Sequence, residues 1–170
     1  GLSTGAYYTP VAGYYPSNSR DSSGSVDLGY GMIYGYSGDD TIIALGSGED
    51  RLLGNYGKDT IITYGYGEKD KVSGDNFESE GDSDDLIADF DTFVIGGEGT
   101  VQITDYQIGE QIILLDYDLQ SSEDITINYD FVQDQTTLSF VSGAIDHTDR
   151  VVINGRLKID GFEQTIFTRS

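Results

Sequence analysis

The chain has 170 residues, of which 30 are acidic and 9 basic, so its formal net charge is −21 at pH 7. A surface this acidic repels phosphate backbones and anionic lipid, which argues against binding to nucleic acid or docking on a membrane. The chain has no cysteine, which excludes disulfides, thiolate zinc sites and thiol catalysis. No apolar run approaches the roughly 20 residues that a membrane-spanning helix needs. The 23 glycines and 13 tyrosines favour strands over helices, so we expect an all-β protein whose acidic excess needs a counterion.

Composition divides the chain into three zones. Residues 1–28 are rich in tyrosine and contain Pro10 and Pro16, and they are expected to form either a cap over the open end of the following repeats or an arm that packs on a neighbouring subunit. Residues 29–91 carry glycine–aspartate repeats, and residues 92–170 alternate apolar runs with polar turns. No basic-then-apolar leader follows Gly1, so we expect a chain that is processed, trimmed or exported without an N-terminal signal.

The middle zone repeats glycine, aspartate and an aliphatic residue with a period of about nine residues. The repeated aspartates are Asp40, Asp50 and Asp59, followed by Asp70 in a stretched copy and by Asp84 or Asp85 in a degenerate copy. A period this short fits a strand of about three residues plus a tight turn. Stacked copies then bury one shared aliphatic column, for which the candidates are Ile33, Ile42, Leu52, Ile61, Val72 and Leu86.

Successive units must reverse direction, so two units make one coil of about eighteen residues. This arrangement places Asp40 beside Asp59 on one edge and Asp50 beside Asp70 on the other, and Asp59 is expected to continue to Asp84 or Asp85. Neighbouring strands lie ~4.8 Å apart, and calcium binds oxygen at roughly 2.3–2.6 Å, so one ion can bridge two stacked turns. Carboxylate and carbonyl donors favour a hard cation, and irregular turns suit calcium better than magnesium. The alternative is that the glycine–aspartate pairs are ordinary turn formers.

Two segments resemble the nonapeptide G-G-x-G-x-D-x-U-x of the RTX (hemolysin-type) calcium-binding proteins. They are Gly35-Tyr36-Ser37-Gly38-Asp39-Asp40-Thr41-Ile42-Ile43 and Gly54-Asn55-Tyr56-Gly57-Lys58-Asp59-Thr60-Ile61-Ile62. The resemblance implies a parallel β-roll with calcium in its turns, in a bacterial protein secreted by a one-step export system. Carried over to this chain, the candidate metal ligands are Gly35, Ser37, Asp39 and Asp40 in the first copy, Ser47, Glu49 and Asp50 in the second, Gly54, Tyr56, Lys58 and Asp59 in the third, and Asp70, Asp84 and Asp85 beyond.

The third zone is expected to form an antiparallel β region packed on the roll. Strand-like runs occupy residues 101–104, 111–115 and 165–168, and a hairpin is expected between 125–131 and 136–141. The strongest hairpin signal is Asn154-Gly155 between residues 151–153 and 156–159, because this dipeptide favours a two-residue type I′ turn. The glycine-rich turn at 96–100 is followed by Val101 instead of aspartate, so we expect it to bind no ion.

No catalytic motif is found in the sequence. His147 is the single histidine, so there is no H-E-x-x-H zinc motif, and no G-x-S-x-G elbow is present. We therefore expect no enzyme, no catalytic residue and no cofactor other than calcium. The leading interpretation is a secreted structural protein of the bacterial cell surface or extracellular space, forming a homo-oligomer, polymer or filament through its N-terminal arm. The alternatives are a non-catalytic export and folding module of a larger enzyme or toxin, and a calcium-dependent adhesin domain that binds surface glycans.

Overall fold

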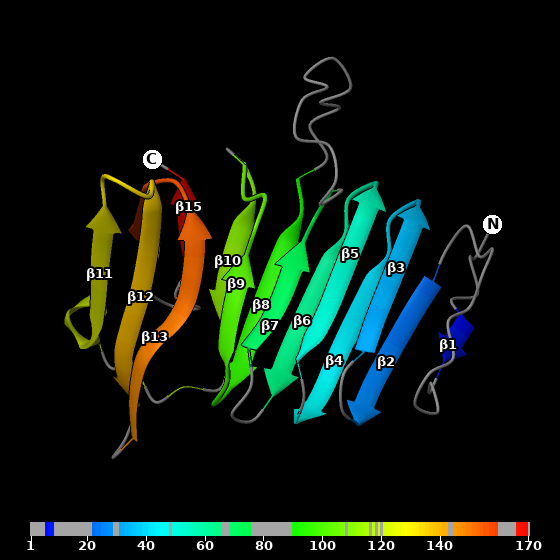
Figure 1. Cartoon of the computed structure of the whole chain (residues 1–170), viewed down its shortest axis with the longest axis horizontal. Coiled ribbons are helices and arrows are strands. Elements are labelled where there is room, and N and C mark those ends of the chain that lie inside the picture. Colours follow the sequence, from blue (N-terminus) through cyan, green and yellow to red (C-terminus); the bar gives the residue numbers. More distant parts are fainter. Residues whose placement is uncertain are drawn as a thin grey trace.

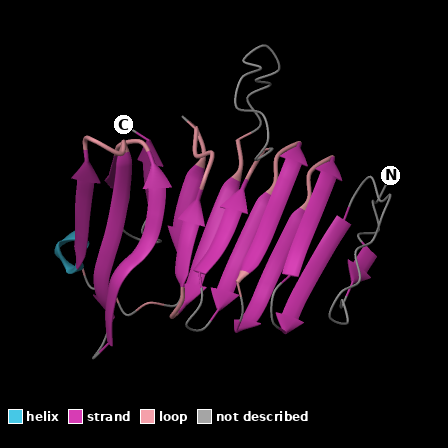
Figure 2. Ribbon diagram, in the orientation of Figure 1, coloured by secondary structure: helices cyan, strands magenta, loops and turns pink. Residues whose placement is uncertain are grey.

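The computed structural model of the chain is all-β (Figures 1 and 2). It describes residues 6–8, 22–28, 31–47, 49–65, 69–75, 90–107, 109–115, 117, 119, 121–142, 145–159 and 166–169. Within these residues the only helical element is one 3-10 turn, η1 (Ser122–Asp124). No helix in this part of the chain is both long enough and apolar enough to cross a membrane.

The described strands form two sheets. In spatial order the eight-stranded sheet contains β1 (Ala6–Tyr8), β2 (Ser22–Leu28), β4 (Thr41–Ser47), β6 (Thr60–Gly65), β8 (Thr92–Gly97), β10 (Gln111–Leu114), β15 (Ile166–Arg169) and β14 (Leu157–Ile159). The seven-stranded sheet contains β11 (Ile125–Asp130), β12 (Gln135–Ser142), β13 (Ile145–Asn154), β9 (Thr100–Ile103), β7 (Lys69–Ser73), β5 (Asp50–Tyr56) and β3 (Gly31–Ser37).

From β2 to β10, successive strands alternate between the two sheets, and neighbours within each sheet run parallel. Two strands and two turns therefore make one coil, as the short repeat predicts. Asp40 and Asp59, one coil apart, are separated by 19 positions, and Asp50 and Asp70 are separated by 20. The coils stack along the long axis of the molecule, from the N-terminal end near β1 toward β11 (Figure 1).

Aliphatic side chains at equivalent positions of the coils form the core between the sheets. Ile42 lies beside Ile61 in the eight-stranded sheet, and Ile33, Leu52 and Val72 follow one another in the seven-stranded sheet. All five are buried, as predicted. Leu86, the sixth predicted member, lies outside the described residues. The strand that pairs next with β6 is β8, and its Phe93 lies beside Ile61.

The parallel pairing continues further along the chain than the sequence suggested. Strand β10 pairs in parallel with β8, and β9 pairs in parallel with both β7 and β13. The antiparallel arrangement expected for residues 101–104 and 111–115 is therefore wrong for these pairings. Antiparallel pairs occur at β10–β15, β14–β15, β12–β13 and β11–β12, of which the last is the predicted hairpin. The repeating coil thus extends past the last glycine–aspartate copy and is followed by a mixed region.

The hairpin predicted at Asn154-Gly155 is also wrong. Strand β13 belongs to the seven-stranded sheet and already pairs on both edges, with β12 and with β9. The chain therefore crosses at Gly155 to the other sheet, where β14 pairs with β15. Only Gly155 has a positive φ, of 89°, and its N–H donates to the carbonyl of Asp134 at 2.6 Å. A type I′ turn needs a positive φ at both central residues.

The N-terminal zone contributes two described strands. Strand β1 pairs in parallel with β2, and β2 pairs in parallel with β4, so both extend the eight-stranded sheet. The remaining residues of the 1–28 zone lie outside the described part, and the choice between a cap and an arm stays a prediction.

Candidate metal centre

The turns that carry the nonapeptide motif adopt the same backbone conformation and stack on each other. Tyr36 and Asn55 have φ values of 77° and 75°, and Gly38 and Gly57 have φ values of 111° and 125°. The Gly38 N–H donates to the Tyr56 carbonyl of the next coil at 2.8 Å. The second and fourth positions of the motif therefore need a left-handed backbone, for which glycine is the least strained residue. Tyr36 and Asn55 adopt it without glycine's freedom.

Buried aspartates follow one another at the start of β4, β6 and β8. The Asp40 N–H donates to Asp59 Oδ1 at 2.8 Å, and the Asp59 N–H donates to Asp91 Oδ1 at 2.7 Å. The predicted neighbours Asp40 and Asp59 are thus brought together. The continuation to Asp84 or Asp85 was wrong, because Asp91 occupies the next place, 32 positions after Asp59. Asp84 and Asp85 themselves lie outside the described residues.

Glycines let the carboxylates approach the backbone of the neighbouring coil. A Cβ atom on Gly35 would lie 2.5 Å from the Gly54 carbonyl oxygen and 2.8 Å from Asp40 Oδ2. A Cβ on Gly54 would overlap both Asp59 Oδ2 and the Gly74 carbonyl oxygen. At each step a carboxylate oxygen of one coil and a carbonyl oxygen of the next face the same small space. These are the donor types that a hard cation prefers.

The opposite edge carries a second, shorter series. The Asp50 N–H donates to Asp70 Oδ1 at 3.1 Å, and both residues are buried, so the second predicted pair is also brought together. Val101 pairs with Asp70 in the next coil, where the sequence has no aspartate. Burial raises the pKa of Asp70, and the charge of Arg150 opposes that rise. The buried Arg150 donates from Nη2 to the Gly96 carbonyl at 2.5 Å, so a protein cation lies near the end of this series.

Burial dominates the pKa values of two aspartates in the first series, Asp59 and Asp91. Burial raises the pKa of Asp59 to about 7, and the charge of Asp40 adds to the effect. Burial likewise raises the pKa of Asp91 to about 8, with contributions from Asp59 and Asp75. Within the described residues, Asp59 Oδ2 and Asp91 Oδ2 are buried and accept no hydrogen bond. Buried carboxylates are normally paired or bound to a metal, so this edge suits a cation.

The other predicted ligands lie around the two edges. Gly35 and Gly54 are buried within β3 and β5. The exposed side chains are those of Ser37, Asp39, Glu49, Tyr56 and Lys58, and Ser47 ends β4. The Lys58 N–H donates to Asp39 Oδ1 at 3.0 Å, which joins the exposed sides of two stacked turns.

Sequence reasoning missed two members of the first series. Asp91-Thr92-Phe93 repeats the pattern Asp59-Thr60-Ile61, and Glu110-Gln111-Ile112 repeats it with glutamate in place of aspartate. The pairing of Thr60 with Thr92, and of Thr92 with Gln111, places both acids in register with Asp59. The missed signal was therefore the acid–x–apolar pattern without its preceding glycines.

No family model, curated protein or solved structure matches this chain. The likeness to the RTX proteins therefore rests on the quoted motif residues, and what it implies enters below as a proposal.

The raised pKa values predict how the stability of the protein depends on pH when divalent cations are removed. A carboxyl group whose pKa is higher in the folded than in the unfolded state binds its proton more tightly after folding. Its stabilising effect is complete below the unfolded pKa of 3.8 and is lost as pH rises to the folded values of about 7 and 8. We expect the free energy of unfolding, measured with urea in cation-free buffer, to fall between pH 5 and pH 8.

Asp91→Asn should flatten this dependence, and the exposed Asp134→Asn should not. A free energy of unfolding that rises with pH over the same interval in the cation-free protein would contradict the assignment.

Proposed function

We propose that this chain is a calcium-stabilised β-roll, and that it serves as a structural protein outside the cell. The observation that carries the proposal is the series of buried aspartates whose Oδ2 atoms, at Asp59 and Asp91, accept no hydrogen bond within the described residues. At Asp40 and Asp59, a carboxylate oxygen of one coil lies beside a carbonyl oxygen of the next coil. In the proposed function Asp40, Asp59 and Asp91 hold ions on one edge, and Asp50 and Asp70 hold an ion on the other.

The bound ion neutralises charges that otherwise repel one another across stacked coils. Because the ligands come from different coils, an ion binds the folded chain and not the unfolded one, so calcium and folding are linked. A site saturated at 100 times its dissociation constant adds ~2.7 kcal/mol. Sites with few carboxylates bind calcium weakly, and extracellular modules work at dissociation constants of roughly 10⁻⁴–10⁻³ M. Calcium occupies such weak sites at the high calcium concentrations outside the cell, which favours a secreted or cell-surface protein.

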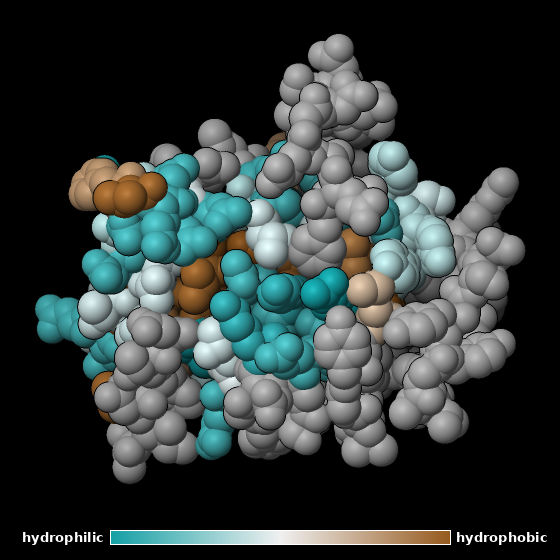
Figure 3. All heavy atoms as spheres, in the orientation of Figure 1, coloured by the Kyte–Doolittle hydropathy of each residue, from teal (hydrophilic) through white to brown (hydrophobic). Residues whose placement is uncertain are grey.

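The ends of the sheets support a role in assembly. Within the described strands, β3 and β11 each pair on one edge only, and an unpaired edge can add a strand from another chain. Phe131 and Val132, in the turn that follows β11, are 80% and 94% exposed. Figure 3 shows a hydrophobic patch at the same end of the molecule. We therefore propose end-to-end contact between copies, with β1 of the N-terminal zone, which lies at the opposite end, as the second participant.

The variant Asp59→Asn tests the calcium function, because its effect on the free energy of unfolding should have opposite signs in chelator and in calcium. Asparagine keeps an oxygen for the Asp40 N–H, and its amide can donate toward the Gly74 carbonyl, while the buried charge is lost. In chelator the variant should therefore be more stable than the wild type, by roughly 1–3 kcal/mol. In saturating calcium it should be less stable, because one ligand is missing. Thermal and urea unfolding in both conditions measure the two changes.

Asp134→Asn is the matched control, since it removes an exposed carboxylate at a position whose φ of 49° asparagine tolerates. The same response to calcium in both variants would refute the assignment of Asp59.

The assembly role is tested with a chain that lacks residues 1–21 and keeps β2. The full chain should form regular polymers when calcium is added, visible by electron microscopy, and chelator should reverse them. The shortened chain should stay monomeric in analytical ultracentrifugation while its melting temperature still rises with calcium. A full chain that remains monomeric in calcium would argue against the structural role and favour a non-catalytic export and folding module.

A further inference from the structure

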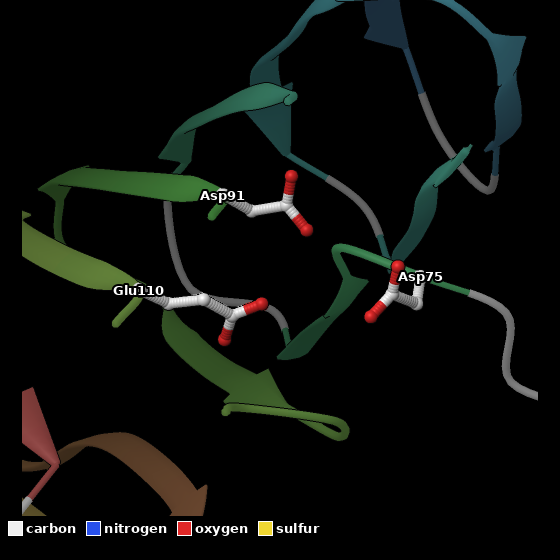
Figure 4. A group of neighbouring side chains, drawn as sticks. All are labelled: Asp75, Asp91 and Glu110. Carbon is white, nitrogen blue, oxygen red and sulfur yellow. The ribbon is translucent and has the colours of Figure 1, made fainter. Parts of the chain in front are cut away.

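Three acidic side chains converge at the end of the aspartate series. Asp75 follows β7, Asp91 precedes β8 and Glu110 precedes β10, and each offers one carboxylate oxygen within 4.8 Å of the others. Figure 4 shows the three carboxylates, carried by separate segments, turned toward a common centre. The nonapeptide motif identified none of the three. They lie next to strands of both sheets, since β7 belongs to the seven-stranded sheet and β8 and β10 to the eight-stranded sheet.

Two of these side chains are buried and have an oxygen that accepts no hydrogen bond within the described residues. Asp91 and Glu110 are 1% and 0% exposed, and the atoms concerned are Asp91 Oδ2 and Glu110 Oε1. Their other oxygens are held by the backbone: Asp91 Oδ1 accepts from the Asp59 N–H at 2.7 Å, and Glu110 Oε2 accepts from the Gln107 N–H at 2.6 Å. Both carboxylates are thus fixed with one oxygen left for a ligand. Native structures rarely leave such atoms without a partner.

The surrounding groups orient the site and add negative charge. Asp105 accepts from the Asp75 N–H at 2.7 Å and from the Gly74 N–H at 3.1 Å, which positions the segment that carries Asp75. The charges that act on Asp91 and Glu110 come from other acids, including Asp75 and Asp105. Three carboxylates with a fourth nearby need a ligand of high positive charge. Since every donor is oxygen, that ligand is a hard multivalent cation.

We propose that Asp75, Asp91 and Glu110 form a calcium site at the end of the first series, which shares Asp91 with that series, binds calcium more tightly than the stacked turns and fills first. The proposal rests on the calcium function proposed above and deepens it. Calcium affinity rises with the number of charged ligands and the rigidity of the site. The stacked turns offer two aspartates per pair of coils, whereas this site offers three carboxylates. The first ion therefore joins β7, β8 and β10, and later ions fill the turns.

The test is isothermal titration calorimetry, in which calcium chloride is added to the full wild-type chain and to the Glu110→Gln variant. Glutamine keeps an oxygen for the Gln107 N–H and removes only the charge. We expect one tight phase and one or more weaker phases in the wild type. In Glu110→Gln the tight phase should weaken at least tenfold while the weaker phases persist. Asp75→Asn, at a half-buried position, should give the same result if Glu110→Gln fails to fold.

Terbium luminescence locates the first ion independently. The Tyr106 hydroxyl donates to the Glu110 carbonyl at 2.9 Å, so the ring lies close enough to sensitise terbium bound at this site. With terbium chloride at one equivalent, Tyr106→Phe should lose most of the emission excited through tyrosine, and Tyr129→Phe, at the distant β11, should keep it.

The outcomes separate this inference from the proposed function. If the wild type binds calcium but the tight phase survives Glu110→Gln, the inference is overturned and the proposed function stands. The same holds if the tight phase is lost equally in Asp134→Asn. No uptake of calcium by the wild type overturns both.

Discussion

The carboxylates of Asp59 and Asp91 lie one above the other on successive coils, each held by a backbone N–H of its neighbour and each with a buried oxygen that accepts no hydrogen bond within the described residues. Strand spacing places like charges close together, and burial removes the water that would screen them. The fold can accommodate this arrangement in two ways, by binding protons or by binding cations. At neutral pH in a calcium-rich medium, the second is the one that leaves every carboxylate charged and paired.

The same short repeat builds both the core and the charged edge. Ile42 and Ile61 point into the core, while Asp40 and Asp59, two positions earlier, face the turn. Glycine is required at position 54, in β5, because a Cβ there would occupy the space that the Asp59 carboxylate and the Gly74 carbonyl of the next coil share. Burial of the apolar column favours stacking of the coils, and in the proposed function the acids make that stacking depend on a bound cation. On that proposal, the chain stays unfolded where calcium is scarce and folds where calcium is abundant.

Much of this arrangement could be predicted from spacing alone. The nine-residue period correctly indicated two strands per coil, the pairing of Asp40 with Asp59, and the buried aliphatic column. Prediction failed where spacing stopped being regular: the chain adds residues between Asp75 and Asp91, and Asp91 resumes the series with the acid–x–apolar pattern but without the glycines that mark the earlier copies. It also failed at Asn154-Gly155, because turn chemistry is local, whereas the free edge that a hairpin needs depends on β9, which is distant in sequence. The carboxylates of Asp75 and Glu110 meet only in three dimensions.

The free energy of unfolding as a function of free calcium tests the central claim most directly. Urea unfolding of the full chain at neutral pH, with calcium set by chelator buffers, should give a stability that rises with the logarithm of calcium concentration. Each ion bound by the folded state alone contributes about 1.4 kcal/mol per tenfold increase, so two or more ions predict a slope of about 2.8 kcal/mol or higher. Magnesium at the same concentrations should have a much smaller effect. A stability in excess chelator equal to that in calcium would contradict the account.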